Sequence, residues 1–129
     1  MRKHPEKKIE NWLKKNLELF EEGMQFIKQQ YRYVYINKDF KKYIQIDILA
    51  KDKLGVYVII EIKRIVNAYT LDEQLKFYMD KFPYYCRGII ASFSKPYKLL
   101  RQKLPSNISV WNIKEKYNAQ RQNVKQTNM

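Results

Sequence analysis

The sequence has little of the residues that build cross-links, metal clusters and tight turns. Its 129 residues include one cysteine, Cys86, one histidine, His4, three glycines and four prolines. One cysteine and one histidine form neither an internal disulfide nor a Cys/His zinc cluster, so a disulfide-rich or zinc-stapled scaffold is excluded. We expect Cys86 to be a small buried residue beside a strand. His4 lies in a frayable N-terminus and is expected to be solvated rather than a catalytic base.

Long hydrophobic runs are also missing. The longest apolar stretches, such as Val56 to Ile60, have about five residues, whereas a membrane-spanning helix needs roughly 20. The N-terminus, Met1 to Glu6, is charged and precedes no apolar signal core. We therefore expect no membrane span, no export and a cytoplasmic location, which for a viral protein would be the host cell. Binding to anionic membranes is a weak alternative, because the expected helices lack a strongly cationic amphipathic face.

Acidic residues are scarce relative to basic ones. There are 13 Asp and Glu against 26 Lys and Arg, which gives a formal net charge of +13 and an isoelectric point near 9.7. Such a charge attracts polyanions and makes a small neutral ligand a less expected partner. Hydrophobic residues make up 45% of the chain and aromatics 15%, which is enough apolar surface for a folded core. The length is typical of one domain.

Hydrophobic periodicity predicts an α/β protein in which helices cover a central mixed β-sheet. The expected elements are a helix over 9–27, a short strand over 31–35, a hairpin over 43–64, a helix over 69–82, a strand over 87–93, a short helix over 96–104 and a strand over 108–113. Thr70 is the expected N-cap of the second helix. The predicted domain covers residues 1–114, and residues 115–129 are expected to form a polar, flexible tail because they are rich in Asn, Gln and Lys.

The hairpin over 43–64 is the strongest signal, because two β-branched runs flank a turn that contains Gly55. A three-residue loop ending at Gly55 places Asp52 opposite Val56 and thereby fixes the pairing of the two strands. Asp47 then lies directly opposite Glu61, and Lys63 lies on the same face as Glu61. On the other face, the register places apolar side chains that suit packing against a helix: Ile46, Ile48, Ala50, Val58, Ile60 and Ile62.

Two carboxylates opposite one another across a strand pair need an explanation, because like charges in that position are destabilising. At a separation of ~4 Å and an effective dielectric constant of ~20, the repulsion is about 4 kcal/mol. A divalent cation with oxygen ligands removes this repulsion, and Mg²⁺ is commonly held by one or two carboxylates together with water and phosphate oxygens. Beside Asp47 and Glu61, the ammonium group of Lys63 could orient water or offset transition-state charge.

This arrangement resembles the D…ExK core of the PD-(D/E)XK nuclease superfamily. The run from Ile46 to Arg64, with Gln74 to Met79 downstream, is similar to the RecB-like C-terminal nuclease domain of the NucS/EndoMS endonucleases. The likeness extends through the first helix, at Glu10–Leu13 and Asn16–Gly23, and covers residues 9–95. One departure is that Ile46 stands where the superfamily has its proline. The resemblance implies a restriction-endonuclease-like αβββαβ core.

The resemblance also implies roles for individual residues and a Mg²⁺ cofactor that Mn²⁺ can replace. Asp47 and Glu61 would bind the metal, Lys63 would be the catalytic lysine, and Gln74 would be the glutamine that follows this motif. Glu10 would be the acidic residue of the first helix, which contributes to the metal site, often through water. Other interpretations stay open: Glu18 or Glu22 could take the place of Glu10, Gln74 could be a polar neighbour of a core stripe, and Lys63 a solvated strand end.

Basic residues interleaved with aromatics recur along the chain, as is typical of nucleic-acid-binding surfaces. The candidates for phosphate contacts are Lys41, Lys42, Arg64 and Lys95. We expect a divalent-metal-dependent DNA endonuclease that selects a DNA structure such as a junction, flap or mismatch, with DNA as partner and no small-molecule cofactor. A homodimer is expected, because a chain this short must reach both strands. The alternative is a catalytically inactive nucleic-acid-binding protein on the same fold.

Overall fold

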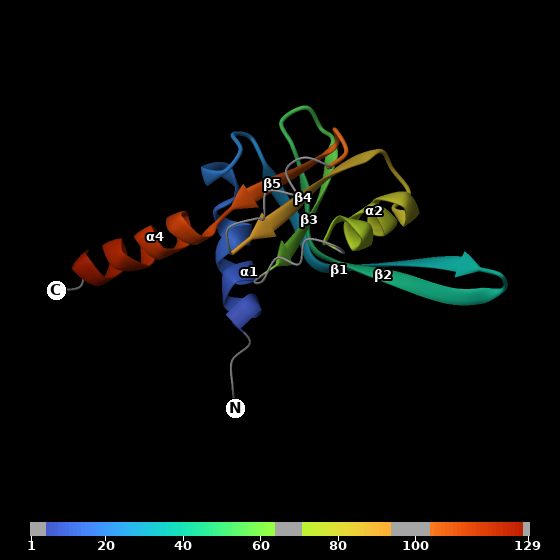
Figure 1. The fold of residues 1–129 in the computed structure, drawn as a ribbon, viewed down its shortest axis with the longest axis horizontal. Helices are drawn as coiled ribbons and strands as arrows, with labels where there is room; N and C mark the ends of the chain where they lie inside the picture. Colours follow the sequence, from blue (N-terminus) through green and yellow to red (C-terminus); the bar gives the residue numbers. More distant parts are fainter. Residues whose placement is uncertain (1–4, 64–70, 94–103, 128–129) are drawn as a thin grey trace.

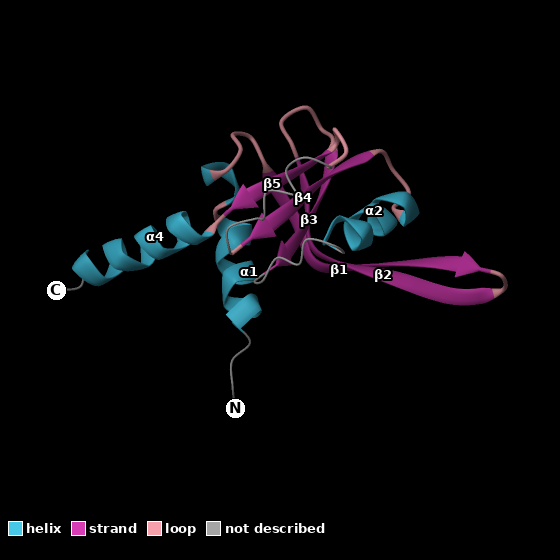
Figure 2. Ribbon diagram, viewed as in Figure 1, coloured by secondary structure: helices cyan, strands magenta, loops and turns pink. Residues whose placement is uncertain are grey.

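Five strands, which follow one another in sequence order across one mixed sheet, form the centre of the protein (Figures 1 and 2). The structure is a computed structural model and describes residues 5–63, 71–93 and 104–127. The elements are α1 (Pro5–Lys15), the 3-10 turn η1 (Leu17–Leu19), β1 (Gln25–Asn37), β2 (Phe40–Lys51), β3 (Tyr57–Lys63), α2 (Leu71–Lys81), β4 (Cys86–Ser92), β5 (Ile108–Asn112) and α4 (Lys114–Thr127). Strands β1 to β3 pair antiparallel, and β3 to β5 pair parallel. The predicted α/β class and αβββαβ order are confirmed.

Two hydrophobic clusters lie on opposite faces of the sheet. On one face, α1 contributes Ile9 and Leu13 to a cluster with the inner residues of β2, β3 and β4. On the other face, α2 contributes Leu75 to a cluster that continues under the base of β1 and β2. At Gly88 in β4, an added Cβ atom would lie only 2.7 Å from the Met79 sulfur, so α2 packs directly against the backbone there. This close approach fixes the position of α2 over the sheet.

The predicted helix over 9–27 is wrong beyond Lys15. The chain leaves the helix at Asn16, passes through η1 and turns at Gly23, whose φ of +79° suits glycine. Strand β1 then starts at Gln25. The apolar residues beyond Lys15 keep helical spacing only by coincidence. Leu17 and Met24 are both buried, but Leu17 lies in the 3-10 turn and Met24 in a loop, not on one face of a helix.

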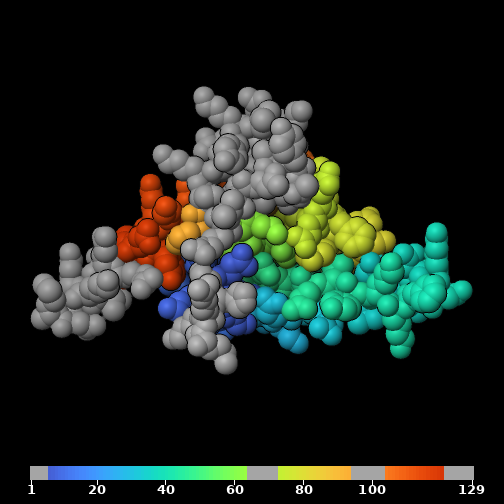
Figure 3. Space-filling model, turned by 60° about the horizontal axis from the view of Figure 1, so that its bottom comes forward, coloured from blue at the N-terminus to red at the C-terminus, as the bar shows by residue number. Residues whose placement is uncertain are grey.

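Strand β1 is much longer than the predicted strand over 31–35, and it pairs with β2 along its whole length. Lys38 and Asp39 join the two strands with φ values of 50° and 69°, as in the two-residue turns that match the twist of a hairpin. The distal half of this hairpin projects beyond the rest of the molecule (Figures 1 and 3). Ile46 was placed on the wrong face, since it packs with the α2 cluster whereas Ile48 packs with the α1 cluster.

The C-terminal residues, expected to form a flexible tail after residue 114, instead form helix α4. Its first turns are anchored by Tyr117, which is buried with its ring centroid 5.2 Å from that of Trp12. Gln120 adds a hydrogen bond, because the Trp12 indole N–H donates to its side-chain oxygen at 2.8 Å. Because a single buried aromatic residue in a polar stretch gives almost no hydrophobic periodicity, the sequence pattern does not predict this helix.

The remaining expected elements are confirmed or fall outside the described residues. Strands β4 and β5 and helix α2 match the predicted strands over 87–93 and 108–113 and the predicted helix over 69–82 within two residues at each end. The short helix over 96–104 and the N-cap at Thr70 fall largely or wholly outside the described residues. None of the helices within residues 5–63, 71–93 and 104–127 is long and apolar enough to cross a membrane.

Candidate active site

The site begins where strands β2 and β3 stop pairing. Their register is the predicted one, and its last ladder pair joins Ile48 to Ile60. One residue further on, backbone N–H groups donate to acidic side chains of the facing strand instead of to its backbone carbonyl groups. The Asp47 backbone N–H donates to Glu61 Oε1 at 3.3 Å, and the Ile62 backbone N–H donates to Asp47 Oδ2 at 2.9 Å. The backbone itself therefore holds the two carboxylates side by side.

Burial and mutual repulsion both favour protonation of these carboxyl groups. Glu61 is 5% exposed, and its burial, followed by the neighbouring charge of Asp47, raises its pKa from 4.5 to about 9. Burial also raises the pKa of Asp47, and the negative charge of Glu10 acts in the same direction. Lys63 counteracts both shifts without cancelling them. Glu61 therefore keeps its proton at neutral pH in the metal-free protein, and a cation bound between the two groups would favour the release of that proton.

Lys63 is held by helix α2. Its Nζ atom donates to Gln74 Oε1 at 3.0 Å, and Gln74 Nε2 in turn donates to the Tyr78 hydroxyl oxygen at 2.8 Å. Gln74 and Tyr78 are one helical turn apart and therefore share a face of α2. This chain of hydrogen bonds fixes the direction of the Lys63 ammonium group on the face of β3 that carries Glu61.

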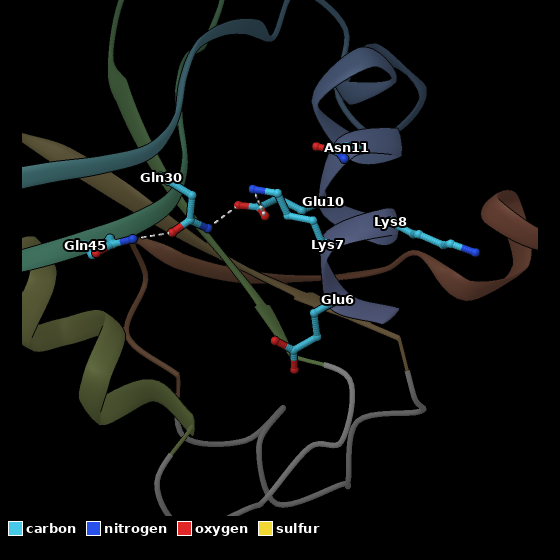
Figure 4. Close-up of a pocket in the computed structure, with 7 residues that line it drawn as sticks. All are labelled: Glu6, Lys7, Lys8, Glu10, Asn11, Gln30 and Gln45. Atoms are coloured by element: carbon cyan, nitrogen blue, oxygen red, sulfur yellow. Dashed lines mark hydrogen bonds and ion pairs between the residues drawn. The ribbon is translucent and has the colours of Figure 1, made fainter. Parts of the chain in front are cut away.

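Glu10 reaches the site through an amide that the sequence did not indicate. Glu10 is 4% exposed, and Gln30 Nε2 donates to Glu10 Oε1 and, at 3.5 Å, to Asp47 Oδ1. Gln45 Nε2 holds the other end of this amide by donating to Gln30 Oε1 at 2.6 Å (Figure 4). The backbone of Gln30 has a φ of 53°, which is uncommon for residues other than glycine and asparagine. One amide group thus bridges two carboxylates from different elements.

A hollow of about 760 Å³ opens beside this bridge, between the start of α1 and the strands β1 and β2 (Figure 4). Its lining residues are Glu6, Lys7, Lys8, Glu10, Asn11, Gln30 and Gln45. Lys7 Nζ lies 3.9 Å from Glu10 Oε2, which partly balances the buried charge. The hollow gives solvent and a ligand access to the Glu10 side of the site.

The donor set suits a hard divalent cation. Carboxylate oxygens are the ligands that Mg²⁺ prefers, and Asp47 and Glu61 present them from adjacent strands in a setting that favours neutralisation. In the described part of the chain, no three His, Cys, Asp or Glu side chains are gathered closely enough to hold a metal together. Glu10 is separated from the pair by Gln30, so it fits a contribution through an intervening group.

The predicted site residues thus come together from four elements, α1, β2, β3 and α2. Glu18 and Glu22, the alternatives to Glu10, are exposed. Gln30, Gln45 and Tyr78 were missed. Tyr78 carried a usable signal, because it follows Gln74 by four residues in a predicted helix, whereas Gln30 acts through a backbone conformation that no pattern predicts.

Of the four residues predicted to contact phosphate, two lie on the hairpin and two fall outside the described residues. Lys41 and Lys42 are exposed on the projecting part of β2, while Arg64 and Lys95 fall outside the described residues. Cys86 is buried in β4, as expected, and burial raises its pKa to about 11. A thiol with that pKa stays protonated and is a poor nucleophile at neutral pH.

Comparisons with known proteins agree with this fold. Over 87% of this chain, the structure resembles the crystal structure of a repair endonuclease from Pyrococcus abyssi, with a TM-score of 0.59 and 17% sequence identity. It also resembles EndoMS in a complex with double-stranded DNA (TM-score 0.57, 17% identity, 81% of this chain) and EndoMS in its apo form (TM-score 0.56, 17% identity, 87%). No curated protein matches.

This chain spans less than half the length of those solved proteins, since it covers 48%, 42% and 47% of them. The model of one family, described as the endonuclease NucS C-terminal domain, matches residues 5–127. That match includes α1, the whole sheet, α2 and α4. The chain therefore belongs to the endonuclease NucS C-terminal domain family.

Proposed function

We propose that this protein is a divalent-metal-dependent DNA endonuclease that hydrolyses phosphodiester bonds. The observation that carries the proposal is the pair Asp47 and Glu61, which the backbone of β2 and β3 holds side by side in a buried position. A protein that used these residues only for folding would gain nothing from two adjacent buried carboxylates, because their repulsion and desolvation oppose folding. Metal-assisted hydrolysis gives the arrangement a purpose.

In this proposal Asp47 and Glu61 hold Mg²⁺, or Mn²⁺ in its place. The bound cation supplies a Lewis acid that activates water and neutralises phosphate charge. Glu10 acts on the same site through the Gln30 amide, which orients Asp47 Oδ1. Lys63 is aimed by Gln74, so that its ammonium group donates a hydrogen bond to the phosphate oxygens and stabilises the negative charge that grows during attack.

DNA is the proposed partner because of charge and family. The formal net charge of +13 favours a polyanion, and one of the similar solved structures is an EndoMS complex with double-stranded DNA. We propose a DNA structure such as a junction, flap or mismatch as the substrate. We also propose a homodimer as the active form, because a chain of 129 residues must reach both strands of a duplex.

A nicking assay on supercoiled plasmid tests the proposal. With Mg²⁺ or Mn²⁺ the wild-type protein should convert the plasmid to the open circle, and EDTA should stop the reaction. Asp47→Ala should abolish cleavage but retain DNA binding that weakens steeply with salt. Cleavage that persists in highly purified Asp47→Ala would refute the assigned site. Salt-sensitive binding without cleavage by the wild type would favour the alternative, an inactive nucleic-acid-binding protein.

A further inference from the structure

The projecting part of the β1–β2 hairpin carries a surface that the proposed chemistry does not use. The pairing of Val34 with Tyr43 and of Ile36 with Lys41 places these residues, together with Arg32, on one face of the hairpin. We call these five residues the arm face. Val34, Ile36 and Tyr43 are 53%, 72% and 55% exposed. Large apolar side chains concentrated at this exposure indicate a binding surface.

The arm is anchored at its base rather than free to swing. On the opposite face, the rings of Tyr31 and Tyr35 pack against Phe82 and Phe77 of the α2 side, with centroids 6.4 Å apart in each case. Lys81 Nζ lies 5.2 Å from the centroid of the Tyr35 ring. The arm face is therefore held in a fixed direction relative to the site.

The arm face is continuous with the candidate active site. Gln45 lies on the same face as Tyr43 and is paired with Arg32. Its amide donates to Gln30, which bridges Glu10 and Asp47. The base of the arm face therefore adjoins the hollow beside Glu10, which Gln30 and Gln45 line.

Charge decides which partner suits this face. Between residues 31 and 45 the hairpin carries four basic residues, Arg32, Lys38, Lys41 and Lys42, against the single acidic residue Asp39. The Arg32 guanidinium lies 4.2 Å from the centre of the Tyr43 ring, which holds it in place beside the apolar patch. A second copy of the chain would bring like charges together, whereas a nucleic acid would bring phosphates.

We propose that the arm face enters a groove of duplex DNA and selects duplexes whose base stacking is already weakened. Val34 and Ile36 act as an apolar wedge at a base step, and Arg32 and Lys41 contact the flanking phosphates. β-ribbons bind DNA grooves in this way, and apolar wedges insert most easily where stacking is weak. The inference rests on the proposed nuclease function, and it names the element that gives that function its preference for a DNA structure.

The length of the arm sets the distance of this contact from the site of cleavage. From Asp47 to Phe40, strand β2 runs seven residues, which at about 3.3 Å per residue is roughly 23 Å. Duplex DNA rises about 3.4 Å per base pair. The wedge should therefore act up to about seven base pairs to one side of the scissile phosphate.

The test compares Val34→Thr/Ile36→Thr with Leu54→Thr as the matched control. Threonine keeps the strand propensity of valine and isoleucine but removes apolar surface. Leu54 is a suitable control because it is 81% exposed and lies in the β2–β3 turn, at the other end of β2. Binding is measured in EDTA by fluorescence anisotropy, with a paired 30-base-pair duplex and the same duplex carrying two adjacent mismatches. The wild type and Leu54→Thr should prefer the mismatched duplex by about tenfold, and the double variant should lose this preference.

A second pair of variants tests the phosphate contacts. Lys41→Gln should reduce the slope of log affinity against log salt by about one and leave the preference for weakened stacking in place. Lys53→Gln, in the β2–β3 turn, should not change the slope. Equal slopes for Lys41→Gln and the wild type would contradict the assignment of Lys41 to phosphate.

The outcomes separate this inference from the proposed function. Loss of the preference in the double variant supports the arm even if the wild type cleaves nothing with Mg²⁺, in which case only the nuclease proposal fails. The arm inference is overturned if the wild type and the double variant prefer the mismatched duplex equally, or if the wild type shows no such preference. Cleavage by the wild type remains possible in either case. A wild type that sediments as a dimer and a double variant that sediments as a monomer would also overturn it, because the face would then belong to a second copy.

Discussion

The backbone N–H of Asp47 donates to the Glu61 carboxylate at 3.3 Å, one residue past the last ladder pair of β2 and β3. In place of the next ladder bond, a side chain accepts from the opposite strand. The Ile62 backbone N–H likewise donates to the Asp47 carboxylate. The spacing of the two acids is therefore set by main-chain atoms rather than by flexible side-chain packing.

Replacing Glu61 by glutamine should stabilise the metal-free protein at alkaline pH. Its pKa of about 9 in the folded state, against 4.5 ordinarily, means that folding retains a proton that the unfolded chain releases as pH rises from 4.5 to 9. The free energy of unfolding of the wild type should therefore fall across that range. In EDTA at pH 8, Glu61→Gln should melt on the order of 5 °C higher than the wild type, measured by circular dichroism.

Glu73→Gln, an exposed change on α2, is the control for this experiment and should melt like the wild type. Adding Mn²⁺ should raise the melting temperature of the wild type and not that of Glu61→Gln. Parallel melting-temperature profiles for the wild type and Glu61→Gln between pH 5 and 9 would show that Glu61 is not the source of the alkaline destabilisation.

Replacing Gln30 by methionine should slow DNA cleavage by about 10- to 100-fold, the usual effect of removing a group that orients metal ligands. The change leaves Glu10 and Asp47 without the amide that bridges them. Gln29→Met is the matched control, because Gln29 is the preceding residue and its side chain bonds to Lys14 and Asn11 of α1 rather than to Glu10 or Asp47. Initial rates on the same duplex give the comparison, and equal rates for the two variants would remove Gln30 from the site.

Replacing Lys63 by methionine should abolish cleavage without abolishing Mn²⁺ binding. The ammonium group offsets charge on the phosphate, whereas the metal ligands are carboxylates. Gln74→Leu, which removes the acceptor 3.0 Å from Lys63 Nζ, should cause a smaller loss. Isothermal titration with Mn²⁺ and a nicking assay separate the two effects. If Lys63→Met cleaves at the wild-type rate, the lysine is only a solvated strand end.

Replacing Asp52 by alanine should reduce stability without reducing the activity of the folded protein. The Asp52 carboxylate accepts from the backbone N–H of Leu54 at 2.9 Å and of Val56 at 3.0 Å, and Arg87 Nε donates to it at 3.1 Å. Losing these partners should cost about 2 kcal/mol. Urea unfolding gives the free energy, and cleavage well below the transition should match the wild type. A large loss of activity there would indicate that the turn at Asp52 also serves the site.

The part of the site that could be predicted from the sequence is the part that local chemistry decides. Asp52 and Gly55 fix the turn, the turn fixes the register, and the register brings Asp47 to Glu61. These steps need only a period and a turn type. The choice of Glu10 came from the family resemblance, and the structure buries this residue in α1.

The remainder depended on contacts between distant segments. Gln30 joins the site through a positive φ value and partners on two other elements. Helix α4 exists beside Trp12, more than 100 residues away in sequence. The predicted extension of the first helix beyond Lys15 is wrong, because a 3-10 turn and the turn at Gly23 give the apolar residues the same spacing as a helix would. Tertiary packing overrides local preference at each of these places.

The central claim is that Asp47 and Glu61 hold a divalent cation between them, and crystals of the wild-type protein soaked in Mn²⁺ test it most directly. Anomalous scattering should show manganese with oxygen ligands from both carboxylates at about 2.0 to 2.2 Å, and crystals of Glu61→Gln treated identically should show none there. Crystals in which both carboxylates remain free of manganese at a concentration that supports full cleavage in solution would contradict it.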